Sequence, residues 1–236
     1  MTPVADPTFR VERALHRSGI HGVIGCDEVG RGALAGPLAV GVVWVDASVG
    51  RFPRGLRDSK MLAEAKREAL APLCRSWVAF HAVGLVSADD VDSLGVTASL
   101  GRAAALAVGE LRRLGAPVDG SAVILDGKHD WFTPAVDADV QVTTRIKADR
   151  DCASVAAASV IAKTHRDGLM RSHDLELPGY GWASNKGYAS REHIEAIERL
   201  GPSRLHRMSW LRSILVGDGP ALFELDEAAS TTVSPA

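Results

Sequence analysis

The stretch Cys26-Asp27-Glu28-Val29-Gly30-Arg31-Gly32-Ala33 decides how this chain is interpreted. It follows the apolar segment Val23-Ile24-Gly25, which is typical of the end of a buried strand. Two adjacent carboxylates at a strand end are costly to desolvate, and a divalent cation between them and a substrate lowers that cost. The Gly-Arg-Gly that follows offers a cation and bare backbone where a bulky anion has to approach. The stretch therefore favours chemistry on a phosphodiester.

The composition indicates one sizeable globular unit. The chain has 236 residues, of which 46% are hydrophobic, and this suits one large domain or a domain with a small appendage. Its apolar runs are shorter than the roughly 20 residues that span a bilayer. Residues 1–10 lack the hydrophobic region of a signal peptide. We expect a cytoplasmic protein that does not associate with membranes.

The three cysteines, Cys26, Cys74 and Cys152, are an odd number without paired spacing. This pattern argues against a disulfide framework and against a zinc site. Cys26 lies beside two carboxylates, which should raise the pKa of its thiol and make it a poor nucleophile. We therefore expect three reduced, mostly buried thiols.

Charge is distributed unevenly along the chain. The net charge is −2, but residues 213–236 hold four acids and no lysine or arginine, so the remainder carries +2. Residues 141–212 hold 12 basic and 8 acidic residues. A mildly basic face of this kind is compatible with nucleic acid, and an ordinary solvated surface explains it equally well.

The hydrophobic pattern predicts an α/β fold. Strands are expected at residues 23–27, 38–45, 77–86, 122–125 and 140–146. Helices are expected at residues 11–18, 61–73, 100–114, 154–170 and 191–200. The connections of the first three strands favour an antiparallel meander, and the later segments alternate between strand and helix. Together these patterns predict a mixed sheet with helices on its faces.

Two further acids follow later elements. Asp126 closes the strand at 122–125, and Asp149 lies between the last strand and an alanine-rich helix. If the strands are neighbours, these acids converge with Asp27 and Glu28 at one end of the sheet. Without metal the four carboxylates would repel and hold protons. Two Mg²⁺ ions roughly 4 Å apart would form a two-metal site for in-line phosphoryl transfer.

Each acid also has a simpler explanation. Asp126 before a glycine is typical of a turn, and Asp149 suits a helix cap. Strand alternation places Asp27 and Glu28 on opposite faces, so both join one cluster only if the chain turns at Glu28.

The glycines outline a P-loop and a dinucleotide-binding loop. The first lacks its Lys-Ser/Thr, and the acids before the second would repel a pyrophosphate.

Seven motifs occur in one order between Gly25 and about Trp210. They are Asp27-Glu28-Val29-Gly30-Arg31-Gly32, Asp58-Ser59-Lys60, Leu125-Asp126-Gly127, Lys147-Ala148-Asp149, residues 156–163, Asn185-Lys186-Gly187-Tyr188 and His206-Arg207-Met208-Ser209-Trp210. In these motifs the chain resembles bacterial ribonuclease HII, the type 2 ribonuclease H. The resemblance implies a ribonuclease H-like mixed five-stranded sheet flanked by helices, with a C-terminal helical extension.

The resemblance also implies how the chain is divided and what it does. We expect a lead-in at residues 1–20, a catalytic core at 21–172, a helical substrate-binding extension at 173–216 and a flexible acidic tail at 217–236. The implied activity is a metal-dependent endonuclease that cleaves RNA in RNA–DNA hybrids and cleaves 5′ of single ribonucleotides in duplex DNA. The implied metals are Mg²⁺ or Mn²⁺, and the matching catalytic and metal-binding acids are Asp27, Glu28, Asp126 and Asp149.

Matches to the family's substrate-binding residues extend this expectation. Gly30, Arg31 and Gly32 match the loop whose backbone senses a 2′-hydroxyl, and Tyr188 matches the aromatic that stacks on the adjoining deoxynucleotide sugar. Phosphate contacts are expected from Ser59, Lys60, Lys163, Lys186 and Arg207. A surface salt bridge explains any single one of these nearly as well, and Lys163 can instead pack its stem on the sheet.

The expected partners are RNA–DNA hybrid and ribonucleotide-containing duplex DNA, bound by a monomer. The sequence shows no convincing C-terminal motif for binding a replication clamp. Two alternatives stay open. One is another nuclease of the ribonuclease H superfamily, such as ribonuclease HIII or a DNA resolvase, and the other is a nucleic-acid-binding module without catalysis.

Overall fold

A five-stranded mixed sheet forms the centre of the molecule. The computed structural model describes residues 6–215 of the chain. The strand order is β3-β2-β1-β4-β5. The strands are β1 Gly22–Val29, β2 Leu38–Asp46, β3 Phe80–Val86, β4 Ser121–Asp126 and β5 Val140–Arg145. The first three pair antiparallel, and β4 and β5 continue the sheet in parallel with β1, as the sequence predicted.

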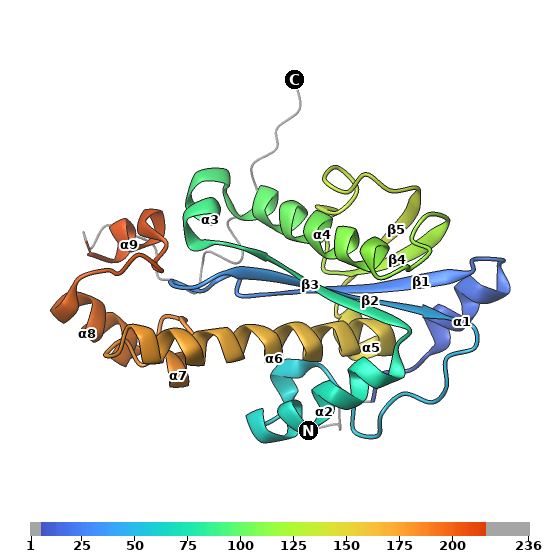
Figure 1. The fold of residues 1–236 in the computed structure, drawn as a ribbon, viewed down its shortest axis with the longest axis horizontal. Coiled ribbons are helices and arrows are strands. Elements are labelled where there is room, and N and C mark those ends of the chain that lie inside the picture. Colours follow the sequence, from blue (N-terminus) through green and yellow to red (C-terminus); the bar gives the residue numbers. More distant parts are fainter. Residues whose placement is uncertain (1–5, 216–236) are drawn as a thin grey trace.

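Helices cover both faces of this sheet. They are α1 Arg10–Arg17, α2 Glu64–Trp77, α3 Ala88–Leu94, α4 Val96–Arg113, α5 Ala148–Asp151, α6 Ala153–Glu176, α7 Trp182–Asn185, α8 Arg191–Leu200 and α9 Met208–Leu215, with a 3₁₀ turn η1 at Ser59–Met61. Figure 1 shows α3 and α4 on one side of the strands and α2, α5 and α6 on the other, with α7, α8 and α9 gathered beyond one end.

Each face of the sheet has its own apolar core because side chains alternate along a strand. Ile24 and Cys26 of β1 point into a core shared with α4, whereas Val23 points into a core shared with α2 and α6. Helix α6 packs very closely on the sheet. A Cβ added at Gly25 would lie 2.4 Å from the backbone of Ser154, so only glycine fits there.

The loop between β1 and β2 joins the sheet to the C-terminal helices. Leu34 N donates to Gly187 O at 2.8 Å, and Arg207 N donates to Leu34 O at 2.8 Å. The side chains of Leu34, Tyr180 and Trp182 share a small buried cluster there. The end of β1 that carries the acids is therefore fastened to the C-terminal segment.

Several helices and strands begin or end at other residues than predicted. Helix α2 continues to Trp77, where a strand was expected, because the Trp77 ring packs edge-on against Phe9 and Phe52. The helices α3, α5, α7 and α9 were not predicted. Helix α6 runs unbroken from Ala153 to Glu176, across the expected domain boundary at residue 172, and that division stays a prediction. The expected tail at 217–236 lies outside the described residues.

No helix within residues 6–215 is long and apolar enough to cross a membrane.

A buried acid ties α1 to the start of α6. Glu12 is fully buried, and its Oε1 accepts from Ser154 N at 2.9 Å and from Ser154 Oγ at 2.7 Å. Its Oε2 has no hydrogen-bond partner. Burial raises the pKa of Glu12, although the bonds from Ser154 oppose this. The folded state therefore disfavours the ionised carboxylate.

We expect Glu12→Gln to make the protein more stable than wild type at pH 8. Glutamine keeps an oxygen for Ser154 and removes the buried charge. The folded state raises the pKa of Glu12, so the wild-type free energy of unfolding falls as pH rises above about 4.5. The variant has no titrating group at this position and lacks this pH-dependent loss of stability. Urea denaturation of both proteins between pH 4 and pH 8 measures the difference. Glu198→Gln, at an exposed position, is the control. The expectation would be contradicted if the unfolding free energies of wild type and Glu12→Gln changed in parallel with pH.

Candidate functional site

Asp27 and Asp126 lie side by side at the ends of neighbouring parallel strands. Cys26 of β1 pairs with Leu125 of β4, so the two acids that follow are adjacent. Asp27 is only 3% exposed, and the Ser159 side chain of α6 lies beside it. Burial raises the pKa of Asp27 well above its usual value, and the charges of Glu28 and Asp126 add to the rise.

Glu28 lies on the opposite pleat, because β1 does not turn there as the sequence analysis required. The strand continues to Val29, and Glu28 pairs with Val40 of β2. Burial raises the pKa of Glu28, the nearby Arg31 guanidinium opposes this at 3.9 Å, and Asp126 adds to it. The Glu28 Oε2 atom is buried without a hydrogen-bond partner.

Asp149 reaches the same place from helix α5. Lys147, before this helix, adopts a left-handed backbone with φ 61°, and Ala148 N then donates to Asp126 Oδ1 at 2.6 Å. This bond joins the end of β4 to the start of α5. Burial raises the pKa of Asp149 to about 7, with further contributions from the charges of Asp126 and Asp58. Burial likewise raises the pKa of Asp126.

Asp58 is a fifth acid at this site, and its motif Asp58-Ser59-Lys60 gave no indication of a role for it. It is buried, its Oδ1 accepts from Lys60 N at 2.9 Å, and its Oδ2 accepts from Arg150 Nε at 3.4 Å. Asp58 also lies near enough to Asp149 to raise the pKa of that acid. The only sequence signal was an acid two residues before a lysine, and this does not distinguish a site from a turn.

Lys60 is the cation that faces the acids. Burial lowers its pKa, but the charges of Asp27 and Asp149 outweigh this, so the pKa of Lys60 is raised. The side chain stays exposed, in contrast to the acids around it. Lys60 therefore offsets part of their repulsion and remains available to a substrate phosphate.

The acids suit a hard divalent cation in type and in charge. Mg²⁺ and Mn²⁺ prefer carboxylate oxygens. The raised pKa values of Asp27, Glu28, Asp126 and Asp149 reflect burial first and the charges of neighbouring acids second. The unpartnered Oε2 of Glu28 is a free ligand atom. Across residues 6–215, however, no three His, Cys, Asp or Glu side chains converge closely enough to hold one ion. The donors fit a cation, and side-chain rotation is needed to close a site around it.

The glycine-rich loop beside the acids contacts Tyr188. Gly30 has φ +82°, and its N–H donates to the Tyr188 hydroxyl at 3.1 Å. A Cβ at Gly30 would lie 2.2 Å from Nε of Arg166, whereas a Cβ at Gly32 would meet nothing within 4 Å. Packing therefore requires glycine at position 30 but leaves open space at position 32.

Arg166 lies beneath this loop as a buried cation that the sequence analysis did not assign. It is fully buried on α6 and donates to the carbonyl oxygens of Pro37 at 2.8 Å, Lys186 at 2.9 Å and Ala35 at 3.0 Å. Its guanidinium also lies 5.3 Å from the centre of the Tyr188 ring. Arg166 thus holds the glycine-rich loop and the Tyr188 segment together.

Three of the expected phosphate contacts are buried in this structure, so their role toward a phosphate stays a prediction. Arg207 is fully buried and donates to Gly30 O at 2.7 Å and to Arg31 O at 2.8 Å. Lys186 pairs with Glu64 at 3.1 Å and donates to a backbone carbonyl. Ser59 is 3% exposed and bonds to another serine. These three side chains hold protein segments in place.

The remaining two expected contacts differ in accessibility. Lys163 pairs with Asp167 at 2.6 Å and lies 5.6 Å from the centre of the Tyr188 ring, while Lys60 remains exposed. Arg31 is also accessible, with 37% of its side chain exposed. Lys60 and Arg31 are therefore the cations best placed for a phosphate.

All three cysteines are free and buried, as predicted. Burial raises the pKa of Cys26 well above its usual value, and the charges of Asp27 and Glu28 add to this. Cys26 therefore contributes to the core and is not a nucleophile.

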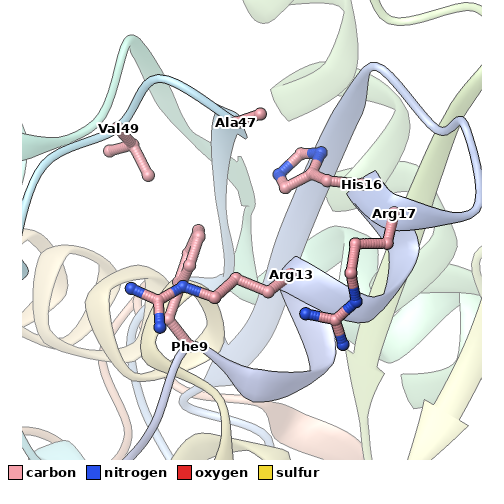
Figure 2. A pocket seen from close by; sticks show the side chains of 6 residues that line it. All are labelled: Phe9, Arg13, His16, Arg17, Ala47 and Val49. Atoms are coloured by element: carbon pink, nitrogen blue, oxygen red, sulfur yellow. The ribbon is translucent and has the colours of Figure 1, made fainter.

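A separate cavity of about 240 Å³ lies at the opposite end of β1. Figure 2 shows its lining of Phe9, Arg13, His16, Arg17, Ala47 and Val49. Helix α1 precedes the first residue of β1, whereas Asp27 and Glu28 lie near the C-terminal end of this strand. The cavity is therefore not part of the carboxylate site.

Comparison with known proteins relates the chain to one family. The family model "Ribonuclease HII" matches residues 24–213. The ribonuclease HII of Streptomyces avermitilis is 44% identical over 209 residues, which cover 88% of this chain and 85% of that protein.

Two solved structures resemble the fold. One is the PCNA:RNase HII complex from Archaeoglobus fulgidus, with a TM-score of 0.65, 24% identity, and coverage of 86% of this chain and 99% of that one. The other is Bst-RNase HIII in complex with Mn²⁺, with a TM-score of 0.58, 27% identity, and coverage of 80% of this chain and 65% of that one. The likeness confirms the mixed sheet flanked by helices.

The family match extends from β1, which carries Asp27 and Glu28, to α9, and so includes all four acids and the glycine-rich loop. The resemblance noted in the sequence is thereby confirmed, and the chain belongs to the ribonuclease HII family.

Proposed function

We propose that this protein is a metal-dependent endoribonuclease that cleaves RNA in RNA–DNA hybrids and 5′ of single ribonucleotides within duplex DNA. The observation that carries the proposal is the adjacency of two features. Four acids with raised pKa values lie at neighbouring strand and helix ends, and a glycine-rich loop bonded to Tyr188 directly follows two of them. The family match supports the same reaction class.

Asp27, Glu28, Asp126 and Asp149 would hold Mg²⁺ or Mn²⁺. When bound there, such cations supply charge neutralisation and a more acidic attacking water. Mn²⁺ occurs in the similar Bst-RNase HIII structure. In this chain, Lys60 lowers the repulsion between the acids, and the Ala148 N–H fixes one oxygen of Asp126.

Recognition of ribose would use the glycine-rich loop and Tyr188. A 2′-hydroxyl donates and accepts, so backbone amide and carbonyl groups can distinguish it from hydrogen. The open space at Gly32 allows a nucleic acid strand to approach the backbone. The half-buried Tyr188 ring, fixed through its hydroxyl to Gly30 N, would stack on the next deoxynucleotide sugar.

The cellular location, oligomeric state and biological role of the enzyme are also proposed. We place it in the cytoplasm as a monomer that removes misincorporated ribonucleotides from DNA. The Archaeoglobus fulgidus structure is a complex with PCNA, whereas the C-terminus of this chain lacks a convincing clamp-binding motif. Clamp recruitment is therefore not included in the proposal.

Cleavage mapping tests the function directly. We expect the purified protein with Mg²⁺ or Mn²⁺ to cut a duplex containing one ribonucleotide on the 5′ side of that ribonucleotide, leaving a 3′-hydroxyl, and to cut an uninterrupted hybrid. An all-DNA duplex should stay intact because it offers no 2′-hydroxyl. Cleavage of all-DNA junctions would support a resolvase, and absence of cleavage on all substrates would support a non-catalytic binding module.

Asp126→Asn should lower kcat by at least about a hundredfold, the scale of losing one electrostatic contact to a transition state. Asparagine keeps an oxygen for Ala148 N but removes the charge that a cation needs. Hybrid binding, measured by fluorescence anisotropy, should change little. The Mg²⁺-linked rise in Tm should also shrink, because fewer ligands bind the ion.

Asp151→Asn is the matched control for Asp126→Asn, since Asp151 is an exposed acid of α5 that pairs with Arg145. It should cleave as wild type does. An Asp126→Asn enzyme with normal activity would remove Asp126 from the ligand set.

Tyr188→Ala should lower kcat/KM about tenfold on a lone ribonucleotide, with a smaller loss on an uninterrupted hybrid, the scale of one base or sugar stacking contact. Tyr188→Phe keeps the ring and loses only the bond from Gly30 N, so it separates stacking from hydroxyl positioning. Competition between the two substrates in one tube measures the ratio. Equal losses on both substrates would contradict the stacking role.

A further inference from the structure

Two histidines form a buried pair behind Tyr188. His193, near the start of α8, is fully buried, and His206, just before α9, is 1% exposed. Their Nε2 atoms are 3.2 Å apart, and their ring centres are 5.3 Å apart. The aromatic rings of Tyr180 and Trp182 pack around the pair. None of these residues contacts the carboxylate site, and the proposed reaction assigns them no role.

The hydrogen bonds around the pair allow one arrangement of protons. Ser203 N donates to His206 Nδ1 at 2.9 Å, so this nitrogen is an acceptor and Nε2 carries the proton. Trp182 Nε1 donates to His193 Nε2 at 3.0 Å, so this nitrogen is an acceptor as well. His206 Nε2–H and Trp182 Nε1–H then share the single lone pair of His193 Nε2, and His193 Nδ1–H donates to Tyr188 O at 2.8 Å.

Tyr188 is therefore held at both ends. Its carbonyl accepts from His193, and its hydroxyl accepts from Gly30 N at 3.1 Å. The chain of bonds runs from Ser203 through both histidines to the backbone of the residue that is proposed to stack on the sugar. A shift of either histidine would move the Tyr188 backbone relative to the glycine-rich loop.

We propose that His193 and His206 are positioning residues, a neutral pair with fixed tautomers that sets the backbone of Tyr188 and thereby the preference for a lone ribonucleotide. This inference rests on the proposed function for its effect on substrate choice. The tautomers themselves follow from the hydrogen bonds alone.

The surroundings keep both rings neutral. Burial lowers the pKa of His206 to about 4, and the His193 ring adds to the decrease. Burial also lowers the pKa of His193, although the bond to Tyr188 O opposes this. The adjacent cation Arg207 directs its guanidinium to Gly30 and Arg31. A proton added to either ring would place two N–H groups against each other.

The experiment compares His193→Phe with Tyr188→Ala and with the double variant. Phenylalanine fills the ring space and cannot donate to Tyr188 O. We expect His193→Phe to lower the ratio of lone-ribonucleotide to hybrid cleavage about fivefold to tenfold, the scale of losing one buried hydrogen bond. In the Tyr188→Ala background the same substitution should leave the ratio unchanged, because His193 acts through Tyr188.

Ile197→Ala is the matched control, since Ile197 lies one turn further along α8 in the same buried cluster and makes no bond to Tyr188. It should lower Tm and keep the substrate ratio. An unchanged ratio in His193→Phe, or equal losses in both backgrounds, would overturn the proposal. So would a shift of the ratio in Ile197→Ala as large as that in His193→Phe.

Nitrogen-15 NMR of the histidine rings at pH 7 tests the pair independently of cleavage. We expect neutral rings, with the proton on Nδ1 of His193 and on Nε2 of His206. A charged ring or the opposite tautomer would overturn the inference. If wild type cleaves neither substrate, the proposed function fails, and the NMR result still decides the arrangement of the pair.

Discussion

Repulsion between carboxylates at one end of the sheet is the constraint around which the molecule is organised. Parallel pairing of β1 with β4 places Asp27 beside Asp126, and the bond from Ala148 N to Asp126 brings Asp149 to the same place. Burial and mutual charge raise the pKa values of these acids. A fold that served stability alone would place apolar side chains here, because buried like charges are costly. The cost is consistent with a site that becomes stable when it binds cations.

The second organising feature is the close contact of α6 with the sheet. Small residues such as Ala158 and glycines such as Gly25 and Gly41 let the helix backbone touch the strands. This contact brings Ser159 to Asp27 and Arg166 to the glycine-rich loop. One helix thus supports both the acids and the loop that is proposed to recognise ribose.

The sequence predicted the strands and the four acids because their signals are local. Alternating and apolar runs mark the strands, and an acid at a strand end is visible in the order of residues. The turn expected at Glu28 was wrong, because pairing with Val40 extends β1 to Val29. The contacts that Arg207 and Lys186 make within the protein were not predicted. Only tertiary structure shows that a basic side chain is buried against backbone carbonyls, since a surface lysine or arginine has the same sequence signal.

The unbroken length of α6 has a geometric consequence. An α-helix rises about 1.5 Å per residue, so the seven residues from Ser159 to Arg166 separate the acid end from the loop-holding end by about 10 Å. A rigid helix of this kind fixes the distance between the carboxylate site and the glycine-rich loop that is proposed to recognise ribose. Lengthening α6 by a single residue would also rotate its far end by about 100°, so helical pitch sets both the distance and the relative orientation of the carboxylate site and the loop.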